Sequence, residues 1–360
     1  MYSKEIKAIK KSNRFRKRIV YDESLIDLAS NDYLGLSSKA QLLNRAVKRI
    51  QMFKNHAPKA SQVVNGYHQI HKDLEEFLCR QNGFEDAILA GSGFLANMAL
   101  IEALPRKGDI LILDEEFHAS GILASKLVNT KVVMFEHNSP EKLENILKNS
   151  IYKRAIIAVE GIYSMSGDLI KKEIFDVVDR YKNTILIVDE AHSSGVIGEK
   201  LLGVFEFFDI KPKHNHIKMG TLGKAYGSYG AYILASKHIV EFLQNRAKSL
   251  VYATAPSLID IELAHQGMLY IMKHCESLHV EVKKRQKLVK NHFGIEMQGL
   301  IFSYEMQSSQ AVLDIQEKLK NNGFLVGAIR PPTVERPILR IIPRLDVSIE
   351  ELKRLFDVYM

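Results

Sequence analysis

The chain has 360 residues, of which 46% are hydrophobic and 26% charged. This composition is typical of a folded protein with a large core, and it argues against a disordered or low-complexity chain. The formal net charge is +8. A basic run from Lys10 to Arg18 contains a single aromatic residue, Phe15. That pattern indicates a solvated arm, or an arm that attracts an anionic substrate or acidic partner, rather than a nucleic-acid surface.

The sequence also gives no indication of membrane association or metal binding. The first residues lack the apolar centre of a signal peptide, and no stretch approaches the length of a membrane span, so we expect a cytoplasmic protein with no membrane partner. Cys79 and Cys275 form no Cys-x-x-Cys pair and have no histidine at ligand spacing. They predict two reduced thiols and no metal site.

Short apolar runs alternate with longer amphipathic stretches through the first two thirds of the chain. Most of the runs are rich in Ile, Leu and Val at both alternating positions, which is typical of strands buried on both faces. They are Ala87–Ala90, Ile110–Leu113, Lys131–Phe135, Ala155–Val159, Thr184–Val188, His216–Met219 and Gly230–Ala235. Helical patterns such as Phe94–Ala103 and Lys172–Tyr181 separate them. Strands that alternate with helices predict an α/β fold with a mostly parallel sheet.

The pattern changes after about residue 255, where the sequence predicts a smaller α+β unit. Its expected helices are Ser257–Lys273, Val280–Asn291, Gln310–Asn321 and Ser348–Val358, and its expected strands are Ile301–Met306 and Leu339–Ile342. The predicted division is an N-terminal arm (1–32), a large domain (33–270) and a small C-terminal domain (271–360).

Five polar segments follow the predicted strands. They are 91–94, 116–118, 160–164, 189–192 and 221–224. Ligands of open parallel sheets bind beyond the carboxyl ends of the strands, so we expect these segments to converge on one rim.

The first segment, Gly91-Ser92-Gly93, is expected to open a helix. Glycine backbone amides and a helix N-terminus suit a phosphate group. Gly91, Gly93 and Ala96 also match the dinucleotide pattern G-x-G-x-x-G/A, although a histidine segment follows the next strand where that pattern expects an acidic residue. A phosphate site, a dinucleotide site and a plain glycine-rich helix start all remain open.

Asp189 ends an aliphatic run, where a carboxylate is costly unless it has a cationic partner. A protonated pyridine nitrogen is such a partner, and an Asp that caps the next helix is the alternative. His192 and His118 are either core histidines or rings that stack on a cofactor or bond its phenolic oxygen. With Asp189 they could suggest a metal, but no third His or Cys supports one.

Lys224 lies among small residues just past a predicted strand, in Thr221-Leu222-Gly223-Lys224. Its amine could form a Schiff base if desolvation or nearby charge lowers its pKa, and Thr221 could bond a cofactor phosphate. A surface lysine is the alternative. The glycine spacing of a nucleotide-binding P-loop is absent.

Taken together, the motifs of this chain resemble the α-oxoamine synthases, a family of pyridoxal phosphate (PLP) enzymes of the aspartate-aminotransferase type. The resemblance covers nearly the whole chain. It is carried by Ser30–Leu36, Gly91–Asn97, His118–Ser120, Glu160–Asp168, Asp189–His192, Gly223–Lys224 and Tyr252–Thr254. It implies fold type I, with a seven-stranded, mostly parallel sheet in the large domain and a small α+β domain.

The resemblance also implies a role for each matching residue. Lys224, Asp189 and His118 would be catalytic, with Lys224 bound to PLP, Asp189 at the pyridine nitrogen and His118 on the ring face. The other cofactor contacts would be Gly93, Phe94, Ser164, His192, Thr221 and, from a neighbouring subunit, Thr254. Asn31 and Arg340 would bind the amino-acid carboxylate, while Arg16 and Thr333 would line the acyl path, with Arg14 and Arg18 as alternatives to Arg16.

Members of the family condense an amino acid with an acyl thioester and release CO2. Residues 329–334 (Ile-Arg-Pro-Pro-Thr-Val) resemble the branch that joins L-alanine to a pimeloyl thioester, on acyl-carrier protein or CoA, for biotin synthesis. The resemblance further implies a homodimer with shared active sites. A branch that joins glycine to acetyl-CoA, a PLP aminotransferase, a nicotinamide dehydrogenase and a non-catalytic binding protein remain as alternatives.

Overall fold

The computed structural model describes residues 1–12 and 14–359, which form two compact units. The large unit contains Asn31–Leu300 and Arg344–Asp346, and the small unit contains Met1–Ser30, Ile301–Pro343 and Val347–Met360. Residues 271–300 thus lie in the large unit, and residues 1–30 lie in the small one. The division into an arm and two domains at residues 32 and 270 stays a prediction.

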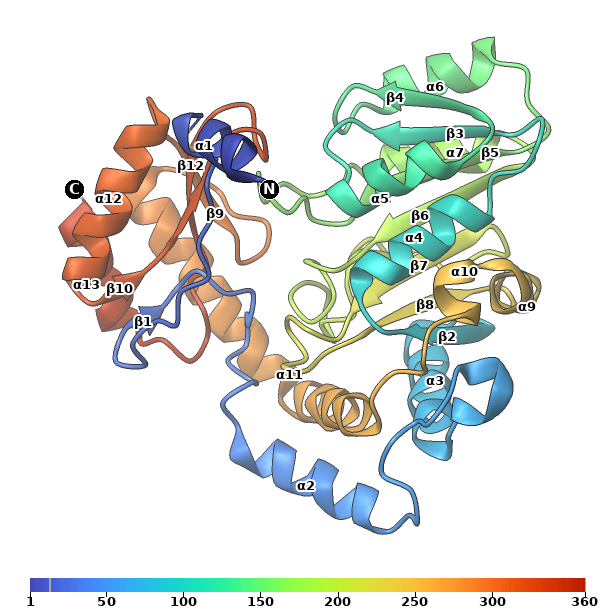
Figure 1. Ribbon diagram of the computed structural model, residues 1–360, viewed down its shortest axis with the longest axis horizontal. Helices are drawn as coiled ribbons and strands as arrows, with labels where there is room; N and C mark the ends of the chain where they lie inside the picture. The colour runs from blue at the N-terminus through green and yellow to red at the C-terminus, as the bar shows by residue number, and fades with distance from the viewer. Residues whose placement is uncertain (13, 360) are drawn as a thin grey trace. The chain divides into compact units, whose positions relative to one another are not determined.

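A seven-stranded sheet forms the centre of the large unit. Its order is β2-β8-β7-β6-β5-β3-β4, which puts β4 and β2 at the two edges (Figure 1). The strands are β2 (Asp86–Ala90), β3 (Ile110–Asp114), β4 (Lys131–Phe135), β5 (Ala155–Glu160), β6 (Thr184–Asp189), β7 (His216–Thr221) and β8 (Ala231–Ala235). Strand β8 runs opposite to the other six and is therefore antiparallel to both β2 and β7, while the remaining pairs are parallel. All seven predicted strands exist, and the mostly parallel sheet is confirmed.

The central strands are buried on both faces, as their unbroken apolar runs predict. Every residue of β3 and β5 is buried. The same expectation is wrong for β4, in which only Phe135 is buried. β4 is an edge strand that pairs with β3 alone, so its outer positions, including Lys131, remain in contact with solvent.

Helices lie around this sheet, some packed on the strands and others packed on other helices. They are α2 (Ala40–Gln51), α3 (Gln69–Asn82), α4 (Gly93–Ala103), α5 (Ala119–Ala124), α6 (Pro140–Asn149), α7 (Glu173–Arg180), α8 (Val204–Phe207), α9 (Lys237–Arg246), α10 (Lys248–Val251) and α11 (Leu258–Phe293). Helix α2, for example, packs on α11. Helix α4 is apolar around most of its circumference and is correspondingly buried. It begins where the Ser92 hydroxyl accepts a hydrogen bond from the Leu95 amide, at 3.3 Å.

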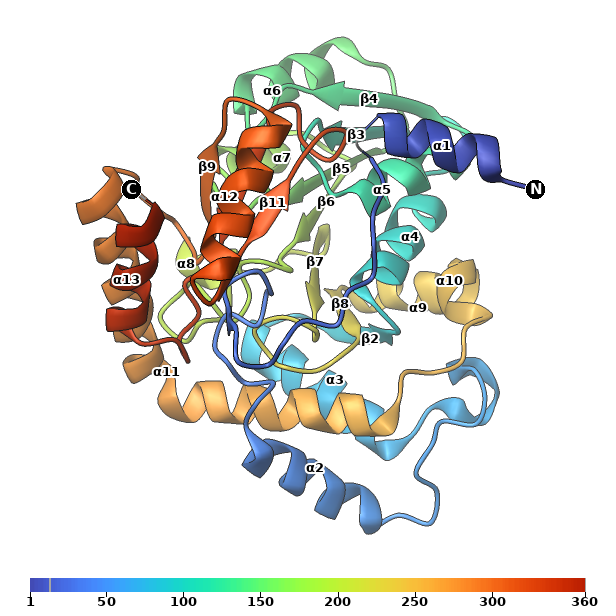
Figure 2. The ribbon, with the colours of Figure 1, turned by 60° about the vertical axis from the view of Figure 1, so that its left-hand side comes forward.

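Helix α11 differs from the prediction of two helices. It runs for 36 residues to Phe293 and is capped by Gly294, which adopts the left-handed conformation that favours glycine. Residues 274–279 contain no glycine or proline, so nothing in them stops a helix, although their polar character hides the apolar period. The helix changes direction along its length (Figure 2).

The small unit contains two short sheets and three helices among its described residues. One sheet is antiparallel with order β11-β12-β9, and the other is the parallel pair β1-β10, which the sequence did not predict. The strands are β1 (Ile26–Asp27), β9 (Phe302–Glu305), β10 (Phe324–Leu325), β11 (Gly327–Ile329) and β12 (Ile338–Ile341); the helices are α1 (Ser3–Lys11), α12 (Ser309–Asn321) and α13 (Ile349–Tyr359). Figure 2 shows α12 beside β11. No helix among the described residues is both long and apolar enough to cross a bilayer.

Candidate active site

The predicted rim exists at the carboxyl ends of the central strands. Glu160, the last residue of β5, is the register partner of Asp189, the last residue of β6, and both are buried. Burial raises the pKa of Glu160 well above its usual value; the charge of Asp189 raises it further, while Lys224 lowers it. The rim therefore brings two buried carboxyl groups together, with the Lys224 amine acting on Glu160.

Lys224 lies in a tight turn after β7. Its Nζ is 2.7 Å from Nε2 of His192, and its side chain is half-buried. Thr221 stabilises the turn, because its hydroxyl donates to the Gly230 carbonyl at 3.0 Å and accepts from the Gly223 amide at 3.2 Å. Lys224 is thus a positioned amine and not a solvated surface lysine.

Asp189 belongs to a hydrogen-bond network that reaches His118. Asn97 Nδ2 donates to Asp189 Oδ2 at 2.8 Å and to the Ser120 hydroxyl at 3.0 Å, and that hydroxyl lies 2.7 Å from His118 Nδ1. Asp189 Oδ1 also accepts from the Ala191 amide at 3.0 Å. The carboxylate therefore stabilises the following turn. Its hydrogen bond to the Ala191 amide does not exclude a second contact between Asp189 and a cofactor.

His118 is held at one nitrogen while its ring remains accessible to solvent. Partial desolvation lowers the pKa of His118; Asp189 opposes this effect and Lys224 adds to it. A neutral flat ring of fixed orientation is suited to stacking on a heterocycle. The stacking role of His118 stays a prediction.

Sequence reasoning gave no role to Asn97 or Ser120, although both lie within the quoted motifs. Asn97 is 1% exposed in the middle of an apolar helix. A buried amide in that setting needs partners, and this was the signal that could have identified it. Its Oδ1 has no hydrogen-bond partner among the described residues.

Gly93 and Thr221 come together at the start of α4. A Cβ built on Gly93 would lie 3.9 Å from the Thr221 Cβ, and Gly93 is the first residue of the helix. The first backbone amides of a helix have no partners within the helix, and together with the helix dipole they favour an anion at this end. The neighbouring Phe94 is exposed. An anion such as a phosphate fits this position.

The loop that carries Ser164 is tied to β3 through His137. Ser164 is buried, and its amide donates to Glu160 Oε2 at 3.0 Å. His137 Nδ1 lies 2.9 Å from Asp114 Oδ1, and its Nε2 lies 3.0 Å from Asp168 Oδ2. The imidazole thus bridges the end of β3 and the far end of the Ser164 loop.

His137 acts as a cation in this cluster. Its partial burial would lower its pKa, but the bonds to Asp114 and Asp168 outweigh that effect and raise the pKa of His137 to about 10. Side-chain atoms of Glu116, His137 and Asp168 all lie within 4.8 Å of one another, a spacing that a cation could use. The protonated ring already supplies the positive charge, and neither of its nitrogens then offers a lone pair.

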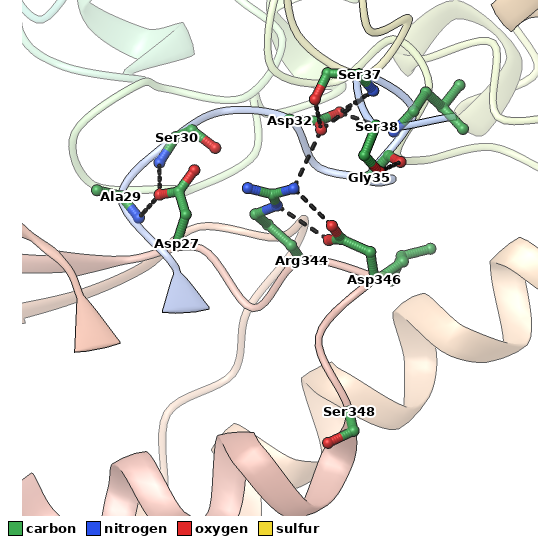
Figure 3. Close-up of polar contacts among 12 residues, drawn as sticks. Asp27, Ala29, Ser30, Asp32, Gly35, Ser37, Ser38, Arg344, Asp346 and Ser348 are labelled. Carbon is green, nitrogen blue, oxygen red and sulfur yellow. Dashed lines mark hydrogen bonds and ion pairs between the residues drawn. The ribbon is translucent and has the colours of Figure 1, made fainter. Parts of the chain in front are cut away.

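Asn31 begins a second anchored segment of the large unit, which continues through Tyr33. Asp32 accepts from the Leu36 amide at 3.0 Å and the Ser37 hydroxyl at 2.5 Å, and Arg344 Nη2 donates to Asp32 at 3.2 Å (Figure 3). Arg344 also makes a two-pronged contact with Asp346 at 3.0 and 2.6 Å. The ion pairs hold this turn in one conformation.

In the small unit, Arg16 and Thr333 lie together. Arg16 Nη2 donates to the Thr333 hydroxyl at 3.1 Å. Both line a pocket of about 280 Å³ to which Arg14 and Arg330 also contribute. Such a pocket suits an anion. Arg340 is buried within β12.

Thr254 does not join the rim contacts described above. It is exposed and forms an isolated antiparallel bridge with Ser61. Its predicted role needs a neighbouring subunit, and it stays a prediction.

Sequence comparison places the chain among known proteins. The aminotransferase class I and II profile matches residues 23–358. The chain is 45% identical over 364 residues to the 8-amino-7-oxononanoate synthase of Helicobacter pylori (strain ATCC 700392 / 26695), covering 100% of this chain and 97% of that relative. It is 33% identical to a putative 8-amino-7-oxononanoate synthase of Aquifex aeolicus (strain VF5), covering 97% and 94%. This chain is an α-oxoamine synthase of the class I and II aminotransferase family.

Solved structures of this family share the fold. The 8-amino-7-oxononanoate synthase of Francisella tularensis aligns with a TM-score of 0.77 at 25% identity, over 94% of this chain and 97% of that one. Sphingomonas wittichii serine palmitoyltransferase aligns with a TM-score of 0.90 at 24% identity, over 100% and 97%. The predicted fold type I, PLP as cofactor and an acyltransferase activity are confirmed by family membership.

The residues present fit PLP. They provide a positioned amine (Lys224), a buried carboxylate (Asp189), an accessible imidazole face (His118) and a glycine helix start beside Thr221. Each of these groups matches one chemical feature of the cofactor: aldehyde, ring nitrogen, ring face and phosphate.

Proposed function

We propose that this chain condenses L-alanine with a pimeloyl thioester to give 8-amino-7-oxononanoate, CO2 and the free carrier, in biotin synthesis. The observation that carries the proposal is full-length 45% identity to a synthase of that product, in a chain whose Lys224, His192 and Asp189 are held at one rim. The predicted cytoplasmic location fits two cysteines that are both free thiols.

The rim residues account for the chemistry that such a reaction requires. PLP, when bound, supplies an electron-withdrawing ring that stabilises negative charge at the substrate α-carbon. Asp189 would hold a proton at the ring nitrogen, since a buried carboxylate favours a cation beside it. The Lys224 amine would take the proton from the substrate α-carbon and later return one. His192 orients the Lys224 amine through its Nε2.

The small unit supplies groups that suit the acyl substrate. Pimelate has a second carboxylate, and the pocket at Arg16, Arg330 and Thr333 offers guanidinium groups whose planar forks match carboxylate oxygens. We assign Arg16 and Thr333 to the acyl path. Asn31 and Arg340 are assigned to the alanine carboxylate. Acyl-carrier protein and CoA are both acidic enough to be attracted by the basic Lys10–Arg18 run.

A homodimer is part of the proposal. Several large apolar side chains of the large unit are exposed, including Tyr252 at 81%, Val64 at 75% and Tyr229 at 60%. Tyr252 lies two residues before Thr254. Val64 lies three residues after Ser61, the residue that forms the bridge with Thr254. Exposed apolar groups clustered on neighbouring segments are typical of an interface. Sedimentation analysis of the wild type and Tyr252→Asp tests it, with dissociation expected for the variant.

The reaction assay separates the candidate functions. Purified protein with PLP should show a visible absorption band, and borohydride should attach the cofactor to Lys224. Alanine with pimeloyl-CoA or pimeloyl carrier protein should release one CO2 per thiol. Turnover of glycine with acetyl-CoA instead would favour the other synthase branch. Keto acid without CO2 would indicate an aminotransferase, and NADH binding without PLP a dehydrogenase.

A further inference from the structure

One buried amide side chain connects the two groups that are assigned to the cofactor ring, Asp189 and His118. Asn97 lies on α4, and its Nδ2 donates to Asp189 Oδ2 at 2.8 Å and to the Ser120 hydroxyl at 3.0 Å. Ser120 lies on α5, which packs against α4 (Figure 2), and its hydroxyl is 2.7 Å from His118 Nδ1. Both hydrogens of one amide group are therefore used, one toward each of the two groups.

The charge of Asp189 decides which end of the amide faces it. An ionised carboxylate accepts hydrogen bonds and donates none, so Asn97 must present Nδ2 to it. The reverse orientation would place two acceptor oxygens against each other. The observed orientation leaves Asn97 Oδ1 without a hydrogen-bond partner among the described residues, a cost that the bond to a charged acceptor offsets.

The proton on the His118 ring can be placed from a donor that never changes its role. The backbone N–H of Ser120 donates to His118 Nδ1 at 3.2 Å, so Nδ1 is an acceptor and carries no proton. The neutral ring is then protonated at Nε2. The Ser120 hydroxyl also donates to Nδ1, because the Asn97 Nδ2 on its other side is itself a donor.

The contacts thus form a chain in which each group donates to the next, from Asn97 through Ser120 to His118. We propose that Asn97 is a positioning residue that holds Asp189 in place and, through the Ser120 hydroxyl, keeps the ring proton of His118 on Nε2. A second proton on the ring would have to enter at Nδ1, where two donors already point, so the chain opposes an imidazolium. A neutral imidazole leaves the charge of Asp189 to the ring nitrogen of the cofactor. The inference rests on the proposed function only for the placement of Asp189 and His118 at the cofactor.

Other charged groups act on His118 and must stay constant in a test. Burial lowers the pKa of His118, while Asp189, at the end of β6, raises it and Lys224, in the turn after β7, lowers it. Glu160, at the end of β5, interacts electrostatically with both of those groups. Neither Asn97→Leu nor Ser120→Ala adds or removes a charge. A change in the titration of His118 in these variants therefore reports the hydrogen-bonded chain.

The first test uses the full chain without ligand. Nitrogen-15 NMR of labelled histidine should find the neutral His118 ring of the wild type protonated at Nε2, and protonation at Nδ1 would overturn the proposal without any variant. Ser120→Ala removes a donor that stabilises the neutral ring, so the pKa of His118 should rise by about one unit. Ser125→Ala is the matched control, because that hydroxyl donates to the Ile122 carbonyl at 2.9 Å, and the pKa of His118 should not change. An unchanged pKa of His118 in folded Ser120→Ala contradicts the chain.

The second test compares the two ends of the chain. Absorbance titration should show that Asn97→Leu weakens the affinity for PLP roughly tenfold, because Asp189 is no longer held, and NMR should show a raised pKa of His118 as well. Ser120→Ala should change the pKa of His118 and leave the affinity for PLP within about twofold of the wild type. Unchanged affinity in folded Asn97→Leu, or an equal loss in Ser120→Ala, contradicts the role of Asn97.

These results are separate from the test of the proposed reaction. The tautomer of wild-type His118 is measured without cofactor or substrate, and it decides the proposal even if Asn97→Leu does not fold. A chain that binds PLP but makes a different product would leave the NMR and affinity results as expected. Failure of the proposed function would then appear only in the reaction assay.

Discussion

The rim of the large unit and the arginine pocket of the small unit are both expected to bind small molecules, yet they are built differently. At the rim, Asp189 and His192 are about 5% exposed and each is held by neighbouring side chains. In the pocket, Arg16 and Thr333 are exposed and lie outside regular helices and strands. Proton transfer needs fixed distances, whereas a flexible acyl chain can be bound by groups that adapt. The difference predicts that substitutions at the rim lower turnover, whereas substitutions in the pocket weaken the affinity for the substrate.

The largest effect is expected for Lys224→Ala. Loss of the amine removes both the attachment of PLP and the base for the α-proton, so turnover should fall by at least about a thousandfold. Steady-state assays and mass spectrometry after borohydride treatment measure the two effects separately. Cofactor attached to another lysine with full activity would refute the assignment.

Asp189→Asn should come next. The amide keeps the size of the side chain but loses the charge beside the ring nitrogen, and we expect turnover to drop by about a hundredfold or more. The affinity for PLP and the position of its absorption band should also change. If kcat is kept and only KM rises, Asp189 would act on substrate affinity as the pocket residues are expected to do. The proposed difference between the rim and the pocket would then be wrong.

His137→Gln tests how firmly the rim is held. The pKa of His137 is about 10 in the folded chain and 6.5 when unperturbed, so its contribution to stability is complete below pH 6.5 and is lost as the pH rises to about 10. Urea unfolding at pH 6 and pH 9.5 should therefore show a loss of stability in the wild type that is smaller in the variant. His214→Gln, at an exposed position, should keep the wild-type dependence.

The smallest effect is expected for Arg16→Gln. The change removes a guanidinium from the pocket and should raise KM for the pimeloyl thioester about tenfold, with kcat nearly unchanged. Arg14→Gln, which lines the same pocket without the Thr333 bond, is the control and should have a weaker effect. A large fall in kcat for Arg16→Gln would show that the pocket positions groups for the chemistry as well.

Much of the fold could be predicted because its strands are unbroken apolar runs, and the ends of such runs in a parallel sheet meet at one edge. Lys224 and Asp189 could be identified on those grounds, because a charged side chain at the end of a buried strand is costly unless a partner or a function accounts for it. Strands β1 and β10 were missed because each has only two residues and no measurable period. The helix break expected near residue 275 was wrong because polarity is weaker than glycine or proline as a stop signal.

The side-chain network of the rim could not be predicted in the same way. Tyr33 and His192 are 159 residues apart in sequence, and Asn97 and Asp189 are 92 apart. Only the folded sheet brings such pairs together, and no local pattern specifies which hydroxyl or amide meets which nitrogen. The resemblance to the family implied which residues contact the cofactor, and the structure shows which side chains hold those residues in place.

The short stretch Arg344–Asp346 has a consequence for how the protein is made. These residues complete the large unit although they lie near the end of the chain, and the guanidinium they supply holds the turn at Asp32. A ribosome must synthesise residues 301–343 before that guanidinium exists, so the large unit is not complete when its sheet has been made. A fragment truncated at Leu300 would lack a contact that holds its own turn at Asp32.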